Sequence, residues 1–328
     1  MVRKQIILFI MQNDTVLITG ALGQIGSELA EKLISIYGKE KVIVTDIQPK
    51  PSIEQDFIYE ELDVLDSERI YQIVEKYEVK IVYHLAALLS GTAEKNPLFA
   101  WKLNMDSLLT FLELAKEKKI KQLFWPSSIG VFGPDTPKDN TPQNTVHTPS
   151  TVYGISKLSG EYWCNYYHDK FGVDVRSVRF PGLISWKTLA GGGTTDYAVD
   201  IFYKALENNH YTSFLNKGTY LPMLYMDDAI EAIIQLMNAP AEHLSIRTSY
   251  NLGGLSFEPE ELAAEIRKHL PDFTIDYEPD FRQAIADSWP SSIDDEVARK
   301  DWQYQPKYDL DRMTETMLQH LRIKLNIR

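Results

Sequence analysis

Near the start of the chain, a glycine-rich loop separates a predicted strand from a predicted helix. The strand covers residues 15–19, and the loop then reads Gly20-x-x-Gly23-x-x-Gly26. Glycines at this spacing allow a tight turn and a close approach of the backbone to a ligand, and the N-terminus of the helix favours a pyrophosphate. Asp46 ends the next predicted strand, where a carboxylate accepts hydrogen bonds from the adenosine ribose and repels a 2′-phosphate. These features predict a dinucleotide site that prefers NAD to NADP.

Strand and helix patterns alternate through the first half of the chain. Such alternation predicts βαβ units, and therefore a parallel sheet that helices cover on both faces. The predicted fold class is α/β, a doubly wound parallel sheet of the Rossmann type with a smaller C-terminal substrate-binding lobe. The predicted strands cover residues 15–19, 41–45, 57–63, 81–85, 122–125 and 173–179, and the predicted helices cover 25–37, 66–76, 97–118 and 153–171.

The pattern becomes looser in the second half, and this change suggests how the chain divides. Residues 13–182 are predicted to form the dinucleotide-binding domain, to which residues 226–254 return. Residues 183–225 and 255–328 are predicted to form most of the substrate lobe. Residues 1–12 are predicted to be an N-terminal extension.

Two further segments carry local signals. Asp227 and Asp228 stand just before an apolar helical pattern, and they are predicted to cap that helix. The stretch 133–149 is rich in proline, threonine and asparagine, which predicts a long loop beside the site. Loops of this length often act as lids.

Tyr153 and Lys157 lie four residues apart in a predicted helix, so that both side chains project from one face. An ammonium near a phenol favours the phenolate and lowers a tyrosine pKa that is otherwise close to 10. Such a phenol can take a proton from a substrate alcohol. Ser127 and Ser128 precede the pair, and the glycine loop predicts a hydride acceptor. A Tyr-x-x-x-Lys pair alone is common on amphipathic helices, but this combination predicts a hydride-transfer site.

Composition narrows the range of partners and compartments. The chain has 34 basic and 46 acidic residues, and a net charge of −12 argues against a nucleic-acid partner, which would require a basic face. The single cysteine, Cys164, excludes an internal disulfide and fits a reducing compartment, so a cytoplasmic location is expected. The apolar run 6–11 is too short to span a bilayer, and no membrane contact is expected. His84 is expected to be a buried, hydrogen-bonded residue, and no metal is predicted because no cluster has ligand spacing.

The motifs resemble those of the extended short-chain dehydrogenase/reductases over essentially the whole chain. Besides the glycine loop, the two serines and the Tyr-Lys pair, the resemblance rests on Asp63-Val64, His84-Leu-Ala-Ala87 and Asn104. Within this family, the second half is similar to the short-chain-type NAD-dependent L-threonine 3-dehydrogenases. The strings that carry this similarity cover residues 179–186, 191–200, 221–228 and 289–290.

The resemblance implies oxidation of the β-hydroxyl of L-threonine to 2-amino-3-oxobutanoate with reduction of NAD. Tyr153 would be the general base, Lys157 would lower its pKa, and Ser128 or its neighbour Ser127 would hydrogen-bond the substrate oxygen. The implied cofactor contacts are Gly20, Gly23, Gln24, Ile25, Gly26, Asp46, Asp63, Val64, Leu85, Ala86, Ala87, Asn104, Tyr153, Lys157 and Phe180. The implied substrate contacts are Ser90, Ser128, Tyr153, Thr194, Thr195 and Trp289.

Several alternatives stay open at this point. Thr194 and Thr195 could serve only as a helix cap, and Trp289 could only fill an interface. A nucleotide-sugar epimerase or dehydratase has the same fold, but Pro181 stands in a string whose counterpart in that class contacts the diphosphate, and proline cannot donate such a bond. A catalytically inactive NAD-binding regulator is the third alternative, although Tyr153 and its lysine partner are present. The resemblance also implies a homodimer, paired through helices 97–118 and 153–171.

Overall fold

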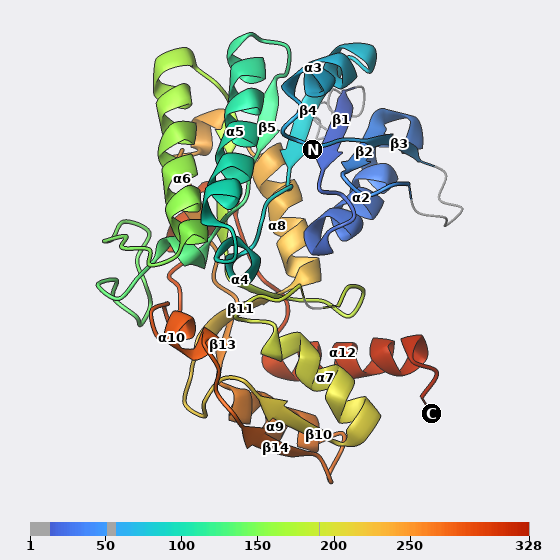
Figure 1. Cartoon of the computed structure of the whole chain (residues 1–328), viewed down its shortest axis with the longest axis vertical. Helices are drawn as coiled ribbons and strands as arrows, with labels where there is room; N and C mark the ends of the chain where they lie inside the picture. The colour runs from blue at the N-terminus through green and yellow to red at the C-terminus, as the bar shows by residue number, and fades with distance from the viewer. Residues whose placement is uncertain (1–13, 51–56, 190, 328) are drawn as a thin grey trace.

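The computed structural model describes residues 14–50, 57–189 and 191–327, so the predicted extension 1–12 lies outside the described residues. A six-stranded parallel sheet of order β3-β2-β1-β4-β5-β7 forms the centre of the upper part of the molecule (Figure 1). Its strands are β1 (Thr15–Thr19), β2 (Val42–Asp46), β3 (Ile58–Glu61), β4 (Val79–His84), β5 (Gln122–Phe124) and β7 (Val175–Arg176). The strand order reverses beside β1, as a doubly wound sheet requires.

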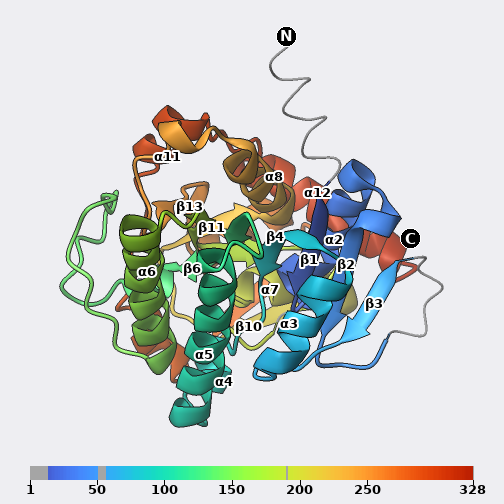
Figure 2. The ribbon, with the colours of Figure 1, turned by 90° about the horizontal axis from the view of Figure 1, so that it is seen from above.

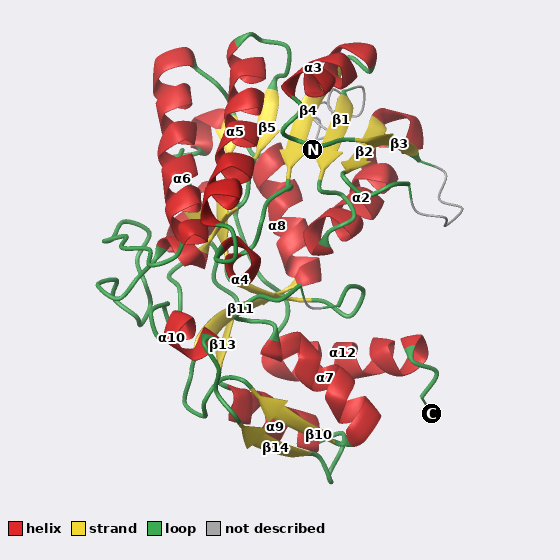
Figure 3. Ribbon diagram, in the orientation of Figure 1, coloured by secondary structure: helices red, strands yellow, loops and turns green. Residues whose placement is uncertain are grey.

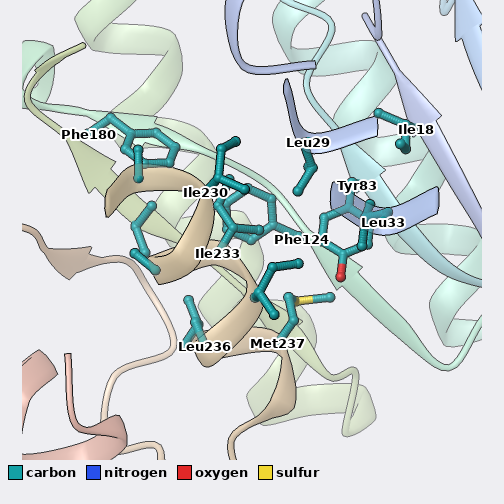
Figure 4. Close-up of a cluster of buried hydrophobic side chains, with 14 of the residues drawn as sticks. Ile18, Leu29, Leu33, Tyr83, Phe124, Phe180, Ile230, Ile233, Leu236 and Met237 are labelled. Carbon is teal, nitrogen blue, oxygen red and sulfur yellow. The ribbon is translucent and has the colours of Figure 1, made fainter. Parts of the chain in front are cut away.

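Helices cover both faces of this sheet, as Figure 2 shows from above. The alternation of side chains along each strand explains why, since Leu17 faces one apolar cluster whereas Val16 and Ile18 face the other. The first cluster packs under α3 (Ser67–Lys76), α5 (Pro97–Lys116) and α6 (Val152–Phe171). The second packs under α2 (Gln24–Tyr37) and α8 (Met226–Asn238), whose Leu29, Leu33, Ile230 and Ile233 are drawn in Figure 4. The predicted α/β class is confirmed.

A second group of elements lies below the sheet in Figure 1 and has its own apolar core. Three helices contact one another there, α7 (Tyr197–Asn208), α9 (Pro259–Arg267) and α12 (Leu310–Lys324). The strands β10 (His210–Ser213) and β14 (Thr274–Tyr277) pair in parallel beside them. The shorter helices of the described chain are α4 (Ser90–Ala93), α10 (Arg282–Ala286), α11 (Glu296–Trp302), η1 (Lys39–Lys41), η2 (Ile129–Val131) and η3 (Ala241–His243).

Two small sheets connect the central sheet with these lower elements. One has the order β12-β8-β6, formed by Tyr250–Asn251, Val178–Phe180 and Ser127–Ser128. The other has the order β13-β11-β9, formed by Leu255–Phe257, Leu221–Tyr225 and Gly182–Ile184. The pairing of β12 with β8 supports the prediction that residues 226–254 return to the first domain, and we retain the predicted division into domains as a proposal.

The predicted single strand over 173–179 is wrong, because the chain changes sheets at Ser177. The strand β7 pairs with β5 in the central sheet, whereas β8 pairs with β6 and β12. The Ser177 carbonyl accepts the Tyr250 N–H at 2.9 Å, and its hydroxyl contacts that of Ser249. These hydrogen bonds to the segment around Tyr250 fix Ser177, the residue at which the chain changes sheets.

The predicted capping role of Asp227 and Asp228 is also wrong. The residue before α8 is Tyr225, and both aspartates lie inside the first helical turn. The Asp228 carboxylate instead accepts the backbone N–H groups of Lys307 and Tyr308 at 2.9 and 3.0 Å. It therefore ties the C-terminal segment to the start of α8.

Residues 133–149 form the long loop that the sequence predicts (Figure 3). Its middle is anchored, because the Gln143 amide donates to the Ser249 carbonyl at 2.8 Å and accepts the Asn251 N–H at 2.8 Å. Thr141 is fully buried and exchanges backbone hydrogen bonds with Ser292 and Asp294. Across the described ranges of the chain, no helix combines the length and apolar character that crossing a bilayer requires.

Candidate active site

A cavity of about 410 Å³ lies at the carboxyl ends of β1, β2 and β4 and extends to the lower elements. This is the edge at which parallel α/β sheets bind ligands. All the predicted catalytic and substrate residues line it, and so do all the predicted cofactor residues except Asn104. Further lining residues, none of them among the predicted site residues, are Ile47, Leu62, Leu88, Leu89, Leu103, Pro126, Ile129, Pro181, Gly182, Leu183, Gly193 and Asp196.

The glycine loop and Asp46 form one end of the cavity. Gly20 has a φ of +66°, and a Cβ there would lie 2.7 Å from the backbone nitrogen of Ala86, so only glycine fits between β1 and the segment after β4. The two Asp46 oxygens accept the backbone N–H groups of Leu22 and Gln48 at 3.0 and 3.1 Å. Each oxygen retains a lone pair for a ribose hydroxyl. The residues present therefore fit a dinucleotide with an unphosphorylated adenosine ribose.

The start of α6 brings Tyr153 and Lys157 to the middle of the cavity. The Thr151 hydroxyl caps this helix by accepting the Gly154 N–H at 3.0 Å. Tyr153 is 8% exposed and Lys157 is 2% exposed. The Lys157 ammonium donates to the Pro126 carbonyl at 2.7 Å and lies 5.6 Å from the centre of the Tyr153 ring.

Burial dominates the electrostatics of this pair. Loss of hydration raises the pKa of Tyr153 to about 12, and a hydrogen bond with Ser128 opposes this rise. Loss of hydration also lowers the pKa of Lys157 to about 7. The sequence predicted a lowered tyrosine pKa, and in this structure that direction is wrong. A dry site disfavours every charged form, and burial cannot be deduced from the spacing of two residues.

The two neighbouring serines have different partners. The buried Ser127 hydroxyl donates to Glu161 Oε1 at 2.6 Å, and Glu161 also pairs with Arg179. The Ser128 hydroxyl accepts the Gly130 N–H at 3.1 Å and hydrogen-bonds Tyr153. Ser128 is therefore the serine adjacent to the tyrosine hydroxyl, whereas Ser127 belongs to a buried polar network.

Asn104 and His84 lie behind the cavity wall. The Asn104 side chain accepts the Leu88 N–H at 2.8 Å and donates to the Leu88 carbonyl at 3.2 Å, and thereby fixes a segment that lines the cavity. His84 hydrogen-bonds Thr19 and Ser107 at 2.7 and 2.9 Å. Burial lowers the pKa of His84 to about 3, so it is neutral at physiological pH. In the part of the chain that the structure describes, no His, Cys, Asp and Glu side chains gather as metal ligands would.

The other end of the cavity is lined by Ser90, Thr194, Thr195 and Trp289. Neither threonine caps α7, because the residue before that helix is Asp196. The Asp196 carboxylate turns back and accepts the N–H groups of Gly192 and Gly193, both at 2.6 Å.

Burial raises the pKa of the Asp196 carboxyl. Asp196 is not among the predicted site residues, although an acidic residue directly after Gly-Gly-Gly-Thr-Thr was a usable signal.

A glycine loop and a strand-end carboxylate that fit a dinucleotide share one cavity with a buried tyrosine, a buried lysine and a serine. This combination defines a Rossmann-type oxidoreductase of the short-chain class. The model of the NAD dependent epimerase/dehydratase family matches residues 16–253. The chain therefore belongs to the NAD dependent epimerase/dehydratase family.

Similar proteins cover nearly the whole chain. An uncharacterized epimerase/dehydratase of Staphylococcus haemolyticus is 53% identical over 314 residues, which are 95% of this chain and 98% of that protein. Among solved structures, the holo form of a GalE-like L-threonine dehydrogenase from Cupriavidus necator is 54% identical with a TM-score of 0.92, covering 94% of this chain and 99% of that one. An L-threonine dehydrogenase from Clostridium difficile is 51% identical with a TM-score of 0.92, covering 95% and 98%.

Proposed function

We propose that this chain oxidises the β-hydroxyl of L-threonine to 2-amino-3-oxobutanoate and uses NAD as the oxidant. The observation that carries this proposal is one continuous cavity, which joins the Asp46 end to Tyr153 and then to a small polar end around Thr195. The two L-threonine dehydrogenases that are 54% and 51% identical to this chain support threonine as the substrate.

The residues at the first end would hold the cofactor. The loop from Gly20 to Gly26 would take the pyrophosphate at the start of α2, and Asp46 would bind the adenosine ribose. Asp63 and Val64 would flank the adenine. When bound, NAD accepts the hydride from the substrate carbon.

Tyr153 would act as the general base for the substrate hydroxyl. The Cβ–H electron pair leaves as hydride while the hydroxyl proton passes to the phenolate oxygen of deprotonated Tyr153, so that a C=O bond replaces the C–OH group. Ser128 hydrogen-bonds Tyr153 and would share the substrate oxygen with it. Burial disfavours the phenolate of Tyr153, and a protonated Lys157, held by the Pro126 carbonyl, would oppose that effect by favouring the phenolate.

The polar end would hold the α-amino and α-carboxylate groups of threonine. Asp196 lines the cavity and offers a carboxylate to an ammonium group, while the Thr195 hydroxyl is available to the substrate carboxylate. Ser90, at the start of α4, is buried and lines the same region. This set of groups matches a small zwitterion, whereas a nucleotide sugar presents a diphosphate that Asp196 would repel.

The direct test is the rate of NADH formation by the purified protein with NAD and a panel of substrates. The proposal predicts turnover with L-threonine and no turnover with D-threonine or UDP-glucose. UDP-glucose is also monitored for epimerisation, because an epimerase returns the hydride from NADH to the sugar and accumulates no NADH. Epimerisation of UDP-glucose without threonine oxidation would show that the protein is a nucleotide-sugar epimerase. NAD binding without either activity would indicate a catalytically inactive NAD-binding regulator.

A further inference from the structure

Gly182 lies on the strand β9, where the substrate end of the cavity meets the strand β11. Its Cα pairs in register with Met223 of β11. A Cβ at position 182 would lie 2.7 Å from Cβ and 2.8 Å from Cγ2 of Thr195, and it would collide with Met223 Sδ. These separations are well inside ordinary van der Waals contact, so a side chain at position 182 would force a neighbour to move.

We propose that Gly182 is a specificity-determining residue, because its missing side chain is what allows Thr195 to sit at the substrate position. This inference rests on the proposed function, and it explains why Thr195 can lie at the substrate end of the cavity. Thr195 lies with its Cβ and methyl group against the Gly182 backbone and also lines the cavity. Any larger residue at 182 would displace Thr195 relative to the cavity and alter the contacts to a small amino acid.

The neighbours of Gly182 have little freedom to absorb a side chain. Met223 is fully buried, in a strand that pairs with β9 on one side and β13 on the other. Thr195 stands between the buried Thr194 and Asp196, whose carboxylate fixes the loop through the N–H groups of Gly192 and Gly193. Closely packed interiors transmit such a strain to the nearest group that can shift. Here that group is the turn around Thr195, which is only partly buried and belongs to no helix or strand, whereas Met223 lies in the middle strand of its sheet.

The NAD end of the cavity is built from other elements. Asp46 and the glycine loop belong to β2 and the β1–α2 connection, whereas the three atoms nearest a Cβ at position 182 belong to Met223 and Thr195. The inference therefore predicts an effect confined to the amino-acid substrate. This selectivity separates it from a general loss of folding.

The test compares Gly182→Ala with Gly254→Ala, measuring the KM for L-threonine, the Kd for NAD and the Tm of each. Gly254 is a matched control, because a Cβ there would press on the same strand, 2.6 Å from the Met223 carbonyl oxygen, and its three nearest atoms belong to Met223 and Leu224 rather than Thr195. Gly182→Ala should raise the KM for threonine about 10- to 100-fold, the loss expected for a displaced hydrogen bond to a charged group. Its Kd for NAD should change less than about twofold, and Gly254→Ala should leave the KM within about twofold.

A double-mutant cycle identifies the clashing group. Thr195→Ser removes the methyl group and keeps the hydroxyl. Adding it to Gly182→Ala should therefore reverse part of the rise in the KM for threonine, with Thr195→Ser alone as the reference. Adding Met223→Ala instead should recover less. An unchanged KM in a folded Gly182→Ala variant, an equal rise in Gly254→Ala, or a parallel loss of NAD binding would each overturn the inference. Failure of the wild-type protein to oxidise threonine would instead reject the proposed function.

Discussion

Replacing Glu161 by Gln should destabilise the protein strongly, because it removes the charge that compensates a buried arginine. Arg179 and Glu161 side chains are 3% and 1% exposed and form two parallel bonds, of 2.9 Å from Nε to Oε1 and 2.7 Å from Nη2 to Oε2. Ser127 donates a third bond to the same carboxylate. Breaking a buried pair of this kind on one side typically costs about 3–5 kcal/mol.

The expected shift of the melting temperature follows from the size of the chain. An unfolding entropy of roughly 2.1 cal/mol/K per residue amounts to about 0.7 kcal/mol/K for 328 residues. The predicted decrease in Tm is therefore about 4–7 °C. Differential scanning calorimetry measures it directly when the transition is reversible.

Glu207→Gln is the matched control for this experiment. Glu207 forms an ion pair with Lys204 at 2.8 Å, but the two side chains are 41% and 49% exposed, and such pairs contribute about 0–1 kcal/mol. A double variant, Glu161→Met with Arg179→Leu, should regain much of the stability because neither charge is then buried alone. A Tm for Glu161→Gln no lower than that of Glu207→Gln would refute the structural argument.

Two other predictions concern the cofactor and the lysine. Asp46→Ala should weaken discrimination against NADP by at least about tenfold in kcat/KM, because the repulsion of a 2′-phosphate disappears; an unchanged NAD/NADP ratio would show that another residue reads the ribose. The pKa of Lys157 is lowered from its ordinary value of 10.5 to about 7 in the folded protein. Between these two pH values the unfolded chain binds one more proton than the folded chain, so the free energy of unfolding rises with pH. The Tm of the wild type relative to Lys157→Met should therefore increase from pH 7 to pH 10, and a flat or falling difference would contradict the shifted pKa.

The sheet could be predicted from the sequence wherever local pattern and local structure agree. The runs that became β1 and β2 are apolar and end in polar signals, and Asp66 caps α3 by accepting the Arg69 N–H at 2.9 Å. The break at Ser177 was not predicted, since valines stand on both sides of it and the two halves differ mainly in the strands with which they pair. Partner choice depends on residues that lie far away in the sequence.

In the site, too, residues set by local spacing could be predicted, whereas roles that depend on the folded surroundings could not. Tyr153 and Lys157 could be identified from their spacing, because a helix of known period fixes their common face. The choice between Ser127 and Ser128 could not, because it depends on the position of Glu161 after folding. Asp196 was missed for a related reason, since its role follows from a carboxylate that folds back onto two glycine N–H groups.

The most direct test of the proposed chemistry is the single-turnover formation of NADH from L-threonine by Tyr153→Phe, beside the wild type. Phenylalanine keeps the buried ring and removes only the hydroxyl that would accept the proton, so NAD binding should change less than about threefold. The loss of general-base catalysis should slow NADH formation by about 10²–10⁴-fold. A variant that binds NAD normally and still forms NADH at more than a tenth of the wild-type rate would contradict the assignment of Tyr153 as the base.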